Sequence, residues 1–207
     1  TPHPLSVPEQ SVAISPDEQR AAPRVTLLIR PAKLGTAEGE FVCVIRDVSA
    51  TGVSVRLFHP LPAGARACLE TETGHRVAMQ RVWVRDSEAG FQFDQPIDVQ
   101  ALINEEGSFR KRKVRIGIEL PVSVRFLGQS HPAKVRNLSQ QGARIETGVQ
   151  LALAQKVLLR SDYLPEIRAQ VRWRRAGEYG LVFEDTFSLG DFAQMAAMLQ
   201  SPSLLGR

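Results

Sequence analysis

The chain has few of the residues that build metal centres and disulfide frameworks. Its 207 residues include two cysteines and four histidines, and none of them stands at a metal-ligand spacing or in a CxxC pair. We therefore interpret Cys43 and Cys68 as small apolar residues of a reducing compartment, with a disulfide between them left open. The apolar runs are only a few residues long, which excludes a helix that spans a membrane.

Catalytic signatures are absent as well. The sequence contains no GxSxG motif, P-loop or dinucleotide-binding fingerprint, and no nucleophile is paired with a base. We therefore expect no enzymatic activity, no metal and no cofactor. The first residues also lack the charged-then-apolar order of a signal peptide, so we expect a cytoplasmic location.

The charge balance is mildly basic. The formal net charge is +4 and the isoelectric point is about 9.4. This balance suits an anionic partner, but an ordinary solvated surface explains it equally well. Aromatic residues make up 6% of the chain and are scattered, which gives little support to an extended stacking platform for nucleic acid bases.

One motif recurs at a fixed distance. The sequence DVSATG at 47–52 returns as NLSQQG at 137–142, and the two serines are 90 residues apart (139 − 49). The two tryptophans, Trp83 and Trp173, are separated by the same distance. The repeat therefore predicts two similar domains rather than one large one.

The strand pattern predicts the fold of each repeat. Short apolar or alternating runs between glycine and proline turns are typical of a small antiparallel barrel. Segment 41–45 is almost continuously apolar, as expected of a strand covered on both faces. We therefore predict a mainly β protein with two tandem antiparallel six-stranded barrels. Its expected parts are a flexible leader at 1–17, a first barrel at 18–104, a basic linker at 105–114 and a second barrel at 115–200.

Helical spacing occurs in two places. A short helix is expected at 97–103, after the first barrel, and a C-terminal helix at 189–199, with Ser188 as its N-cap. The simplest role of the second helix is to close the second barrel, and a dimerising helix is the alternative.

Residues 167–174 give the clearest strand of the chain. Ile167, Ala169, Val171 and Trp173 alternate with polar residues and so share one face. On this pattern we interpret Trp173, and by the repeat Trp83, as core residues rather than ligand-stacking residues.

The repeated motif has residue types that suit ligand binding. Asp47 offers two acceptor oxygens, which can receive the N–H and NH2 donors of a guanine edge in parallel. Ser49 adds a hydroxyl on the same face of a strand. Gly52 either adopts a backbone angle closed to other residues or leaves room for a ligand. A local turn between two strands explains the same residues without any ligand.

Paired basic residues precede each repeat. Arg20 and Arg24 are four residues apart, just before the first strand, and Lys111 and Arg115 hold the corresponding places in the second repeat. A guanidinium can bridge phosphate oxygens or the N7 and O6 atoms of guanine, and it can stack on a base. The combination in both halves favours a ligand site over chance surface charge.

These motifs resemble those of the PilZ domain family. RAAPR at 20–24 with DVSATG is similar to the RxxxR and [D/N]xSxxG signature of these small bacterial β-barrels, and KRKVR at 111–115 with NLSQQG is similar again. The resemblance implies that the ligand is cyclic di-GMP. It also implies that Arg20 and Arg24 clamp phosphates and guanines, while Asp47, Ser49 and Gly52 hold another guanine edge and shape the pocket.

The second copy departs from the signature. The resemblance places a possible second site at Arg110, Lys111, Arg115, Asn137, Ser139 and Gly142. Lys111 keeps the charge of an arginine but loses its planar fork, for which Arg110 or Arg112 can compensate. We therefore expect the first domain to be the main binder and the second to bind weakly or to be structural, with the opposite outcome left open.

The leading hypothesis is a non-catalytic receptor in which cyclic di-GMP changes the interdomain arrangement or exposes a surface for an effector protein. A tandem barrel that has lost its ligand and acts as a protein-interaction adaptor is the alternative. A third hypothesis is a nucleic acid binder that uses the basic linker with Arg168, Arg172 and Arg174, and we rank it lowest.

Overall fold

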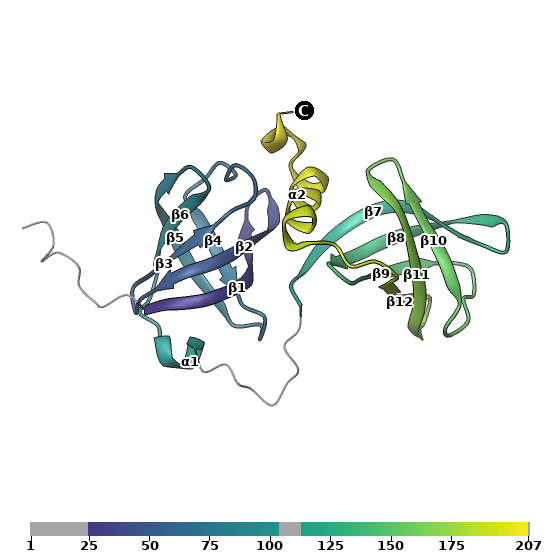
Figure 1. Cartoon of the computed structure of the whole chain (residues 1–207), viewed down its shortest axis with the longest axis horizontal. Helices are drawn as coiled ribbons and strands as arrows, with labels where there is room; N and C mark the ends of the chain where they lie inside the picture. Colours follow the sequence, from purple (N-terminus) through teal and green to yellow (C-terminus); the bar gives the residue numbers. More distant parts are fainter. Residues whose placement is uncertain (1–24, 104–112, 207) are drawn as a thin grey trace, which may run out of the picture.

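Two closed barrels form the protein. The computed structural model describes residues 25–103 and 113–206, and each barrel has six antiparallel strands (Figure 1). Most of the chain is therefore β-structure, with short helical segments after each barrel. The predicted fold class is confirmed. The leader and most of the basic linker lie outside the described residues, and the sequence-based domain limits stay a prediction.

The first barrel closes in the strand order β1-β2-β3-β6-β5-β4. Strand β1 pairs with both β2 and β4, which seals the cylinder. Its strands are β1 (Val25–Thr36), β2 (Gly39–Val48), β3 (Gly52–Arg56), β4 (Arg66–Glu70), β5 (Arg76–Arg85) and β6 (Glu88–Phe93).

The second barrel repeats this topology strand for strand, in the order β7-β8-β9-β12-β11-β10. Here β7 pairs with β8 and β10. Its strands are β7 (Arg115–Phe126), β8 (Gln129–Ser139), β9 (Gly142–Thr147), β10 (Lys156–Ser161), β11 (Leu164–Arg175) and β12 (Glu178–Phe183). The repeat seen in the sequence is thus a repeat of the whole barrel.

The predicted alternation holds in β11 only as far as Val171. Ile167, Ala169 and Val171 are buried in the second core, whereas Trp173 is 43% exposed. A β-bulge between Val171 and Trp173 shifts the register by one residue and turns the tryptophan outward. The prediction that the tryptophans are core residues is therefore wrong. Trp83 follows the corresponding bulge in β5 and is only partly buried.

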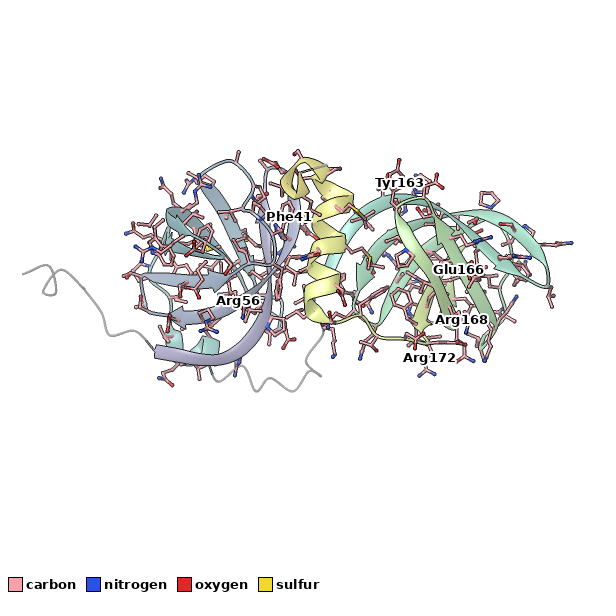
Figure 2. The ribbon with its side chains drawn as sticks, turned by 45° about the horizontal axis from the view of Figure 1, so that its top comes forward. Phe41, Arg56, Tyr163, Glu166, Arg168 and Arg172 are labelled. Carbon is pink, nitrogen blue, oxygen red and sulfur yellow. The ribbon has the colours of Figure 1, made fainter. Side chains whose placement is uncertain are left out.

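Helix α2 (Leu189–Gln200) lies between the barrels (Figures 1 and 2). Its predicted N-cap is confirmed, because the Ser188 hydroxyl accepts a hydrogen bond of 3.1 Å from the Asp191 amide. Phe192 and Ala196 belong to the core of the second barrel, as expected, but Ala197 belongs to the core of the first. The helix therefore covers both barrels. The other helical segments are α1 (Val99–Ile103), as predicted after the first barrel, and η1 (Pro202–Leu205).

Glu40 joins the barrels through hydrogen bonds. Its amide donates to Gln200 Oε1 at 2.6 Å, and its Oε2 accepts from the Gly117 amide of β7 at 2.6 Å. Val42, two residues along β2, is packed into the core of the second barrel. Segment 41–45 is fully buried for this reason, as its unbroken apolar sequence predicts.

Both cysteines are free thiols. Cys43 is buried, and burial raises its pKa to about 12, so this thiol stays protonated and behaves as an apolar residue. Cys68 is partly buried. None of the described helices is both long enough and apolar enough to cross a bilayer.

Candidate functional site

The repeated motif forms the tight connection between the second and third strand of each barrel. In the first barrel the Ser49 amide donates to the Gly52 carbonyl at 2.8 Å, and the Gly52 amide donates to Ser49 Oγ at 3.1 Å. In the second barrel Ser139 Oγ donates to the Gly142 carbonyl at 3.1 Å. Both serines are buried, with exposed fractions of 8% and 2%. Their hydroxyls therefore hold the turns together, as the local interpretation expects.

The glycines of the motif are required by the neighbouring strand. A Cβ atom on Gly52 would lie 2.7 Å from the Phe91 carbonyl oxygen, and one on Gly142 would meet the Leu181 carbonyl oxygen even more closely. Neither glycine is among the residues with positive φ, so the special backbone angle, one of the two alternatives for Gly52, is not adopted. The glycine allows two strands to approach, which fixes the position of the whole turn.

Asp47 stands beside this turn in the first barrel. It is partly exposed, and its Oδ2 accepts a hydrogen bond of 3.0 Å from the Ser54 hydroxyl of β3. In the sheet it lies opposite Thr26 of β1. Arg20 and Arg24 lie outside the described residues, and β1 begins directly after Arg24 in the sequence.

In the second barrel the structure brings several predicted residues together. Arg115 Nη1 donates to Asn137 Oδ1 at 3.0 Å, and Arg115 lies opposite Ser139 in the sheet. Gly142 follows at the other end of the turn. Arg110 and Lys111 lie outside the described residues.

An outward-facing row of side chains continues from each motif across the barrel. Residues directly opposite each other in antiparallel strands share a face, so the register places four residues of each barrel side by side. In the first barrel the row is Asp47, Ser54, Gly90 and Trp83. In the second it is Asn137, Arg144, Gly180 and Trp173.

The tryptophan at the end of each row lies on the glycine. A Cβ atom on Gly90 would collide with the indole of Trp83, and one on Gly180 with that of Trp173. Sequence reasoning missed these residues as part of the site. The signal was available, because the tryptophans recur at the same distance as the motif. Their outward orientation depends on the β-bulges, which no pattern within one strand reveals.

The row of the first barrel combines a carboxylate with an aromatic ring. Asp47 accepts from the Ser54 hydroxyl, and a carboxylate offers about four acceptor sites in all. The carboxylate can accept hydrogen bonds from the amide edge of a flat ligand, while the aromatic ring packs against the face of that ligand. In the second barrel an amide and a guanidinium stand in place of the carboxylate and the hydroxyl. Among the described residues there is no group of acidic, histidine or cysteine side chains that could hold a metal ion.

The two rows differ in their distance from the junction. Asp47 is seven residues from Glu40 on β2, or about 20 Å along the strand. Asn137 lies opposite Gly117, whose amide donates to Glu40. The candidate site of the second barrel is thus next to the contact between the barrels, whereas that of the first barrel is at the far end.

Comparison with known protein families identifies the family of the two barrels. Residues 18–105 and 109–201 each match the family model described as the PilZ domain. No curated protein sequence matches the chain significantly.

Solved structures with a similar chain path share little sequence with this protein. The Borreliella burgdorferi PlzA protein in complex with c-di-GMP is 10% identical, with 89% of this chain and 96% of that chain covered and a TM-score of 0.35. The Bacillus subtilis inhibitor of motility, MotI/DgrA, is 14% identical, with 87% and 100% covered and a TM-score of 0.35. YcgR from Escherichia coli in complex with c-di-GMP is 13% identical, with 80% of each chain covered and a TM-score of 0.31.

The two segments that match the family model together cover most of the chain and coincide with the two barrels. The chain belongs to the PilZ domain family.

Proposed function

We propose that the protein is a non-catalytic receptor for cyclic di-GMP. The observation that carries the proposal is the outward row of Asp47, Ser54, Gly90 and Trp83, which extends the motif turn of a PilZ domain into a surface for a flat, hydrogen-bonding ligand. Cyclic di-GMP has two guanines and two phosphates, so it offers both an amide edge and negative charge.

In the first barrel each residue has a distinct role. Asp47 accepts the N–H and NH2 donors of one guanine, and Trp83 packs against a base. Arg20 and Arg24, which precede β1 in the sequence, bind the phosphates and the second guanine through their planar guanidinium groups. Ser49 and Gly52 keep the turn in position rather than contact the ligand, since their polar groups are bonded to each other.

The second barrel links the ligand to the junction. Arg115 and Asn137 are hydrogen-bonded next to Gly117, which contacts Glu40 of the first barrel. A ligand that draws Arg115 away from Asn137 would disturb this contact and, through it, helix α2. The receptor would then change its interdomain arrangement or expose a surface for an effector protein.

Calorimetric titration of the full chain with cyclic di-GMP tests the proposal. The unmodified protein should bind, and Arg24→Ala should lose most of the binding of the first barrel, whereas Arg115→Ala should affect only the second. A thermal shift supplies an independent readout, since ligand at 100 times its Kd adds about 2.7 kcal/mol of stability. Absence of both heat and thermal shift would leave the adaptor hypothesis in its place.

A further inference from the structure

Position 144 is one of the two places where the rows differ in charge, and the one where the second barrel gains a cation. Arg144 of β9 lies opposite Asn137 on one side and Gly180 on the other. Ser54 holds the same place in the first barrel, opposite Asp47 and Gly90. The first barrel therefore has an anionic group and a hydroxyl at the first two positions of its row, and the second has an amide and a cation there.

The contacts of Arg144 leave part of its hydrogen-bonding capacity unused. Its Nη1 is 3.6 Å from Glu178 Oε1, a long ion pair between side chains that are 41% and 37% exposed. Its Nε is buried and has no hydrogen-bond partner among the described residues. A buried donor without an acceptor is unfavourable, so an acceptor that reaches Nε would be bound with little competition.

A second guanidinium stands on the other side of Asn137. Arg115 donates to the amide oxygen of Asn137, and Arg144 lies across the sheet from the same residue. Arg115 and Arg144 thus stand on the two strands that flank Asn137. Arginines in these positions suit an anion, because each guanidinium presents parallel N–H donors that match phosphate oxygens.

We infer that Arg144 binds a phosphate of the ligand in the second barrel and compensates there for the lysine at position 111. The inference rests on the proposed function of the motif. It differs from the sequence-based expectation that Arg110 or Arg112 compensates, because Arg144 lies on β9, opposite Asn137 in the sheet.

The same arrangement predicts the class of ligand. Asp47 has two carboxylate oxygens for the donors of a guanine edge, whereas the one side-chain oxygen of Asn137 already accepts from Arg115. The second barrel should therefore select cyclic dinucleotides by their phosphates and discriminate weakly between guanine and adenine. The first barrel should discriminate strongly.

The experiment uses the full chain with Arg24→Ala, which weakens the first site and leaves the second to be measured. Cyclic di-GMP is titrated into this protein, into its Arg144→Ser form, which has the residue of the first barrel, and into its Arg144→Lys form. Arg144→Ser should lower affinity at least tenfold, and Arg144→Lys should restore part of it. Arg168→Ser is the matched control, because Arg168 is an exposed arginine on β11 of the same barrel (Figure 2), and it should change affinity less than twofold.

Two further readouts separate the possible outcomes. The Nε–H resonance of Arg144, identified by its loss in Arg144→Ser, should shift on addition of cyclic di-GMP. Cyclic di-AMP should bind the second site within about tenfold of cyclic di-GMP. Binding unchanged in Arg144→Ser, with an unshifted resonance, overturns the role of Arg144 alone. A preference for guanine as large as that of the first site overturns the ligand class, and no binding to the unmodified protein overturns the proposed function as well.

Discussion

The two barrels share their framework and differ in the chemistry displayed on it. Both barrels keep the serine and the glycine of the motif, and both keep a tryptophan that covers a second glycine, Gly90 or Gly180. Each has a structural reason. The serine closes the turn, the motif glycine lets two strands approach, and the indole covers the second glycine. The residues that differ, Asp47 against Asn137 and Ser54 against Arg144, lie between these fixed points. The fold therefore preserves the site's geometry while its charge is free to change.

The hairpins beside the tryptophans differ in the same way. In β5 the residues that flank Trp83 are Val82 and Val84, which are 64% and 47% exposed. In β11 the corresponding residues are arginines, at positions 172 and 174. One barrel thus displays an apolar edge and the other a cationic edge on the same backbone, which points to different surroundings for the two hairpins.

The largest expected effect is on the shared framework. Gly142→Val should destabilise the protein by about 3 kcal/mol, because the new Cβ atom would collide with the Leu181 carbonyl oxygen. Gly52→Val should cost somewhat less, since its closest contact is longer. Gly148→Val is the control, because no atom lies within 4 Å of a Cβ built there. Urea unfolding measures all three, and equal losses at Gly142 and Gly148 would refute the steric explanation.

The next largest effect is on ligand binding, and it distinguishes the candidate site of the first barrel from that of the second. Asp47→Ala should weaken the binding of cyclic di-GMP by tenfold or more, about 1.4 kcal/mol at least, because a charged acceptor is lost. Asn137→Ala should cost less than threefold, since its oxygen already accepts from Arg115. Calorimetry of both variants tests the difference, with Asp162→Ala in the exposed β10–β11 turn as the control. A larger loss in Asn137→Ala would reverse the expected order of the sites.

The tryptophans should show a smaller difference. Trp83→Ala should reduce stability by about 2 kcal/mol and Trp173→Ala by about 1 kcal/mol, because Trp173 is 43% exposed and buries less of its ring. Protein fluorescence in the single-tryptophan variants reports on each ring separately. Quenching by cyclic di-GMP in the variant that retains Trp83 is expected. Unchanged emission there would remove the indole from the proposed site.

The smallest effect concerns the junction. Gln200→Ala removes the hydrogen bonds between helix α2 and Glu40 and should cost about 1 kcal/mol. The barrels should then unfold in two transitions during urea denaturation instead of one, because less of the contact that couples them remains. Gln155→Ala is a suitable comparison, since Gln155 bonds to Ala152 within the second barrel. A single, equally sharp transition in Gln200→Ala would show that the Glu40–Gly117 hydrogen bond and the apolar contacts couple the barrels without Gln200.

Much of the fold could be predicted from local patterns. The distance between the two motifs established the two barrels, and the buried alternation of Ile167, Ala169 and Val171 is visible within a single strand. The unbroken apolar segment 41–45 correctly indicated a strand with two covered faces. The family signature placed the motif turn of each barrel. These features follow from the two-residue period of a strand and from the residue types that a turn requires, and both depend on residues that are close together in the sequence.

Other features could not be predicted without knowing how the strands pair in the sheets. The outward tryptophans depend on bulges that form between partner strands, and Arg144 stands opposite Asn137 only through the register of β8 and β9. Helix α2 has the predicted length and cap, yet its place between the barrels depends on surfaces from both of them. The sequence alone determined which segments are strands, turns and helices, because those choices are local. Only the tertiary structure decided which residues face each other across the ladder, because register is set by the packing of the whole barrel.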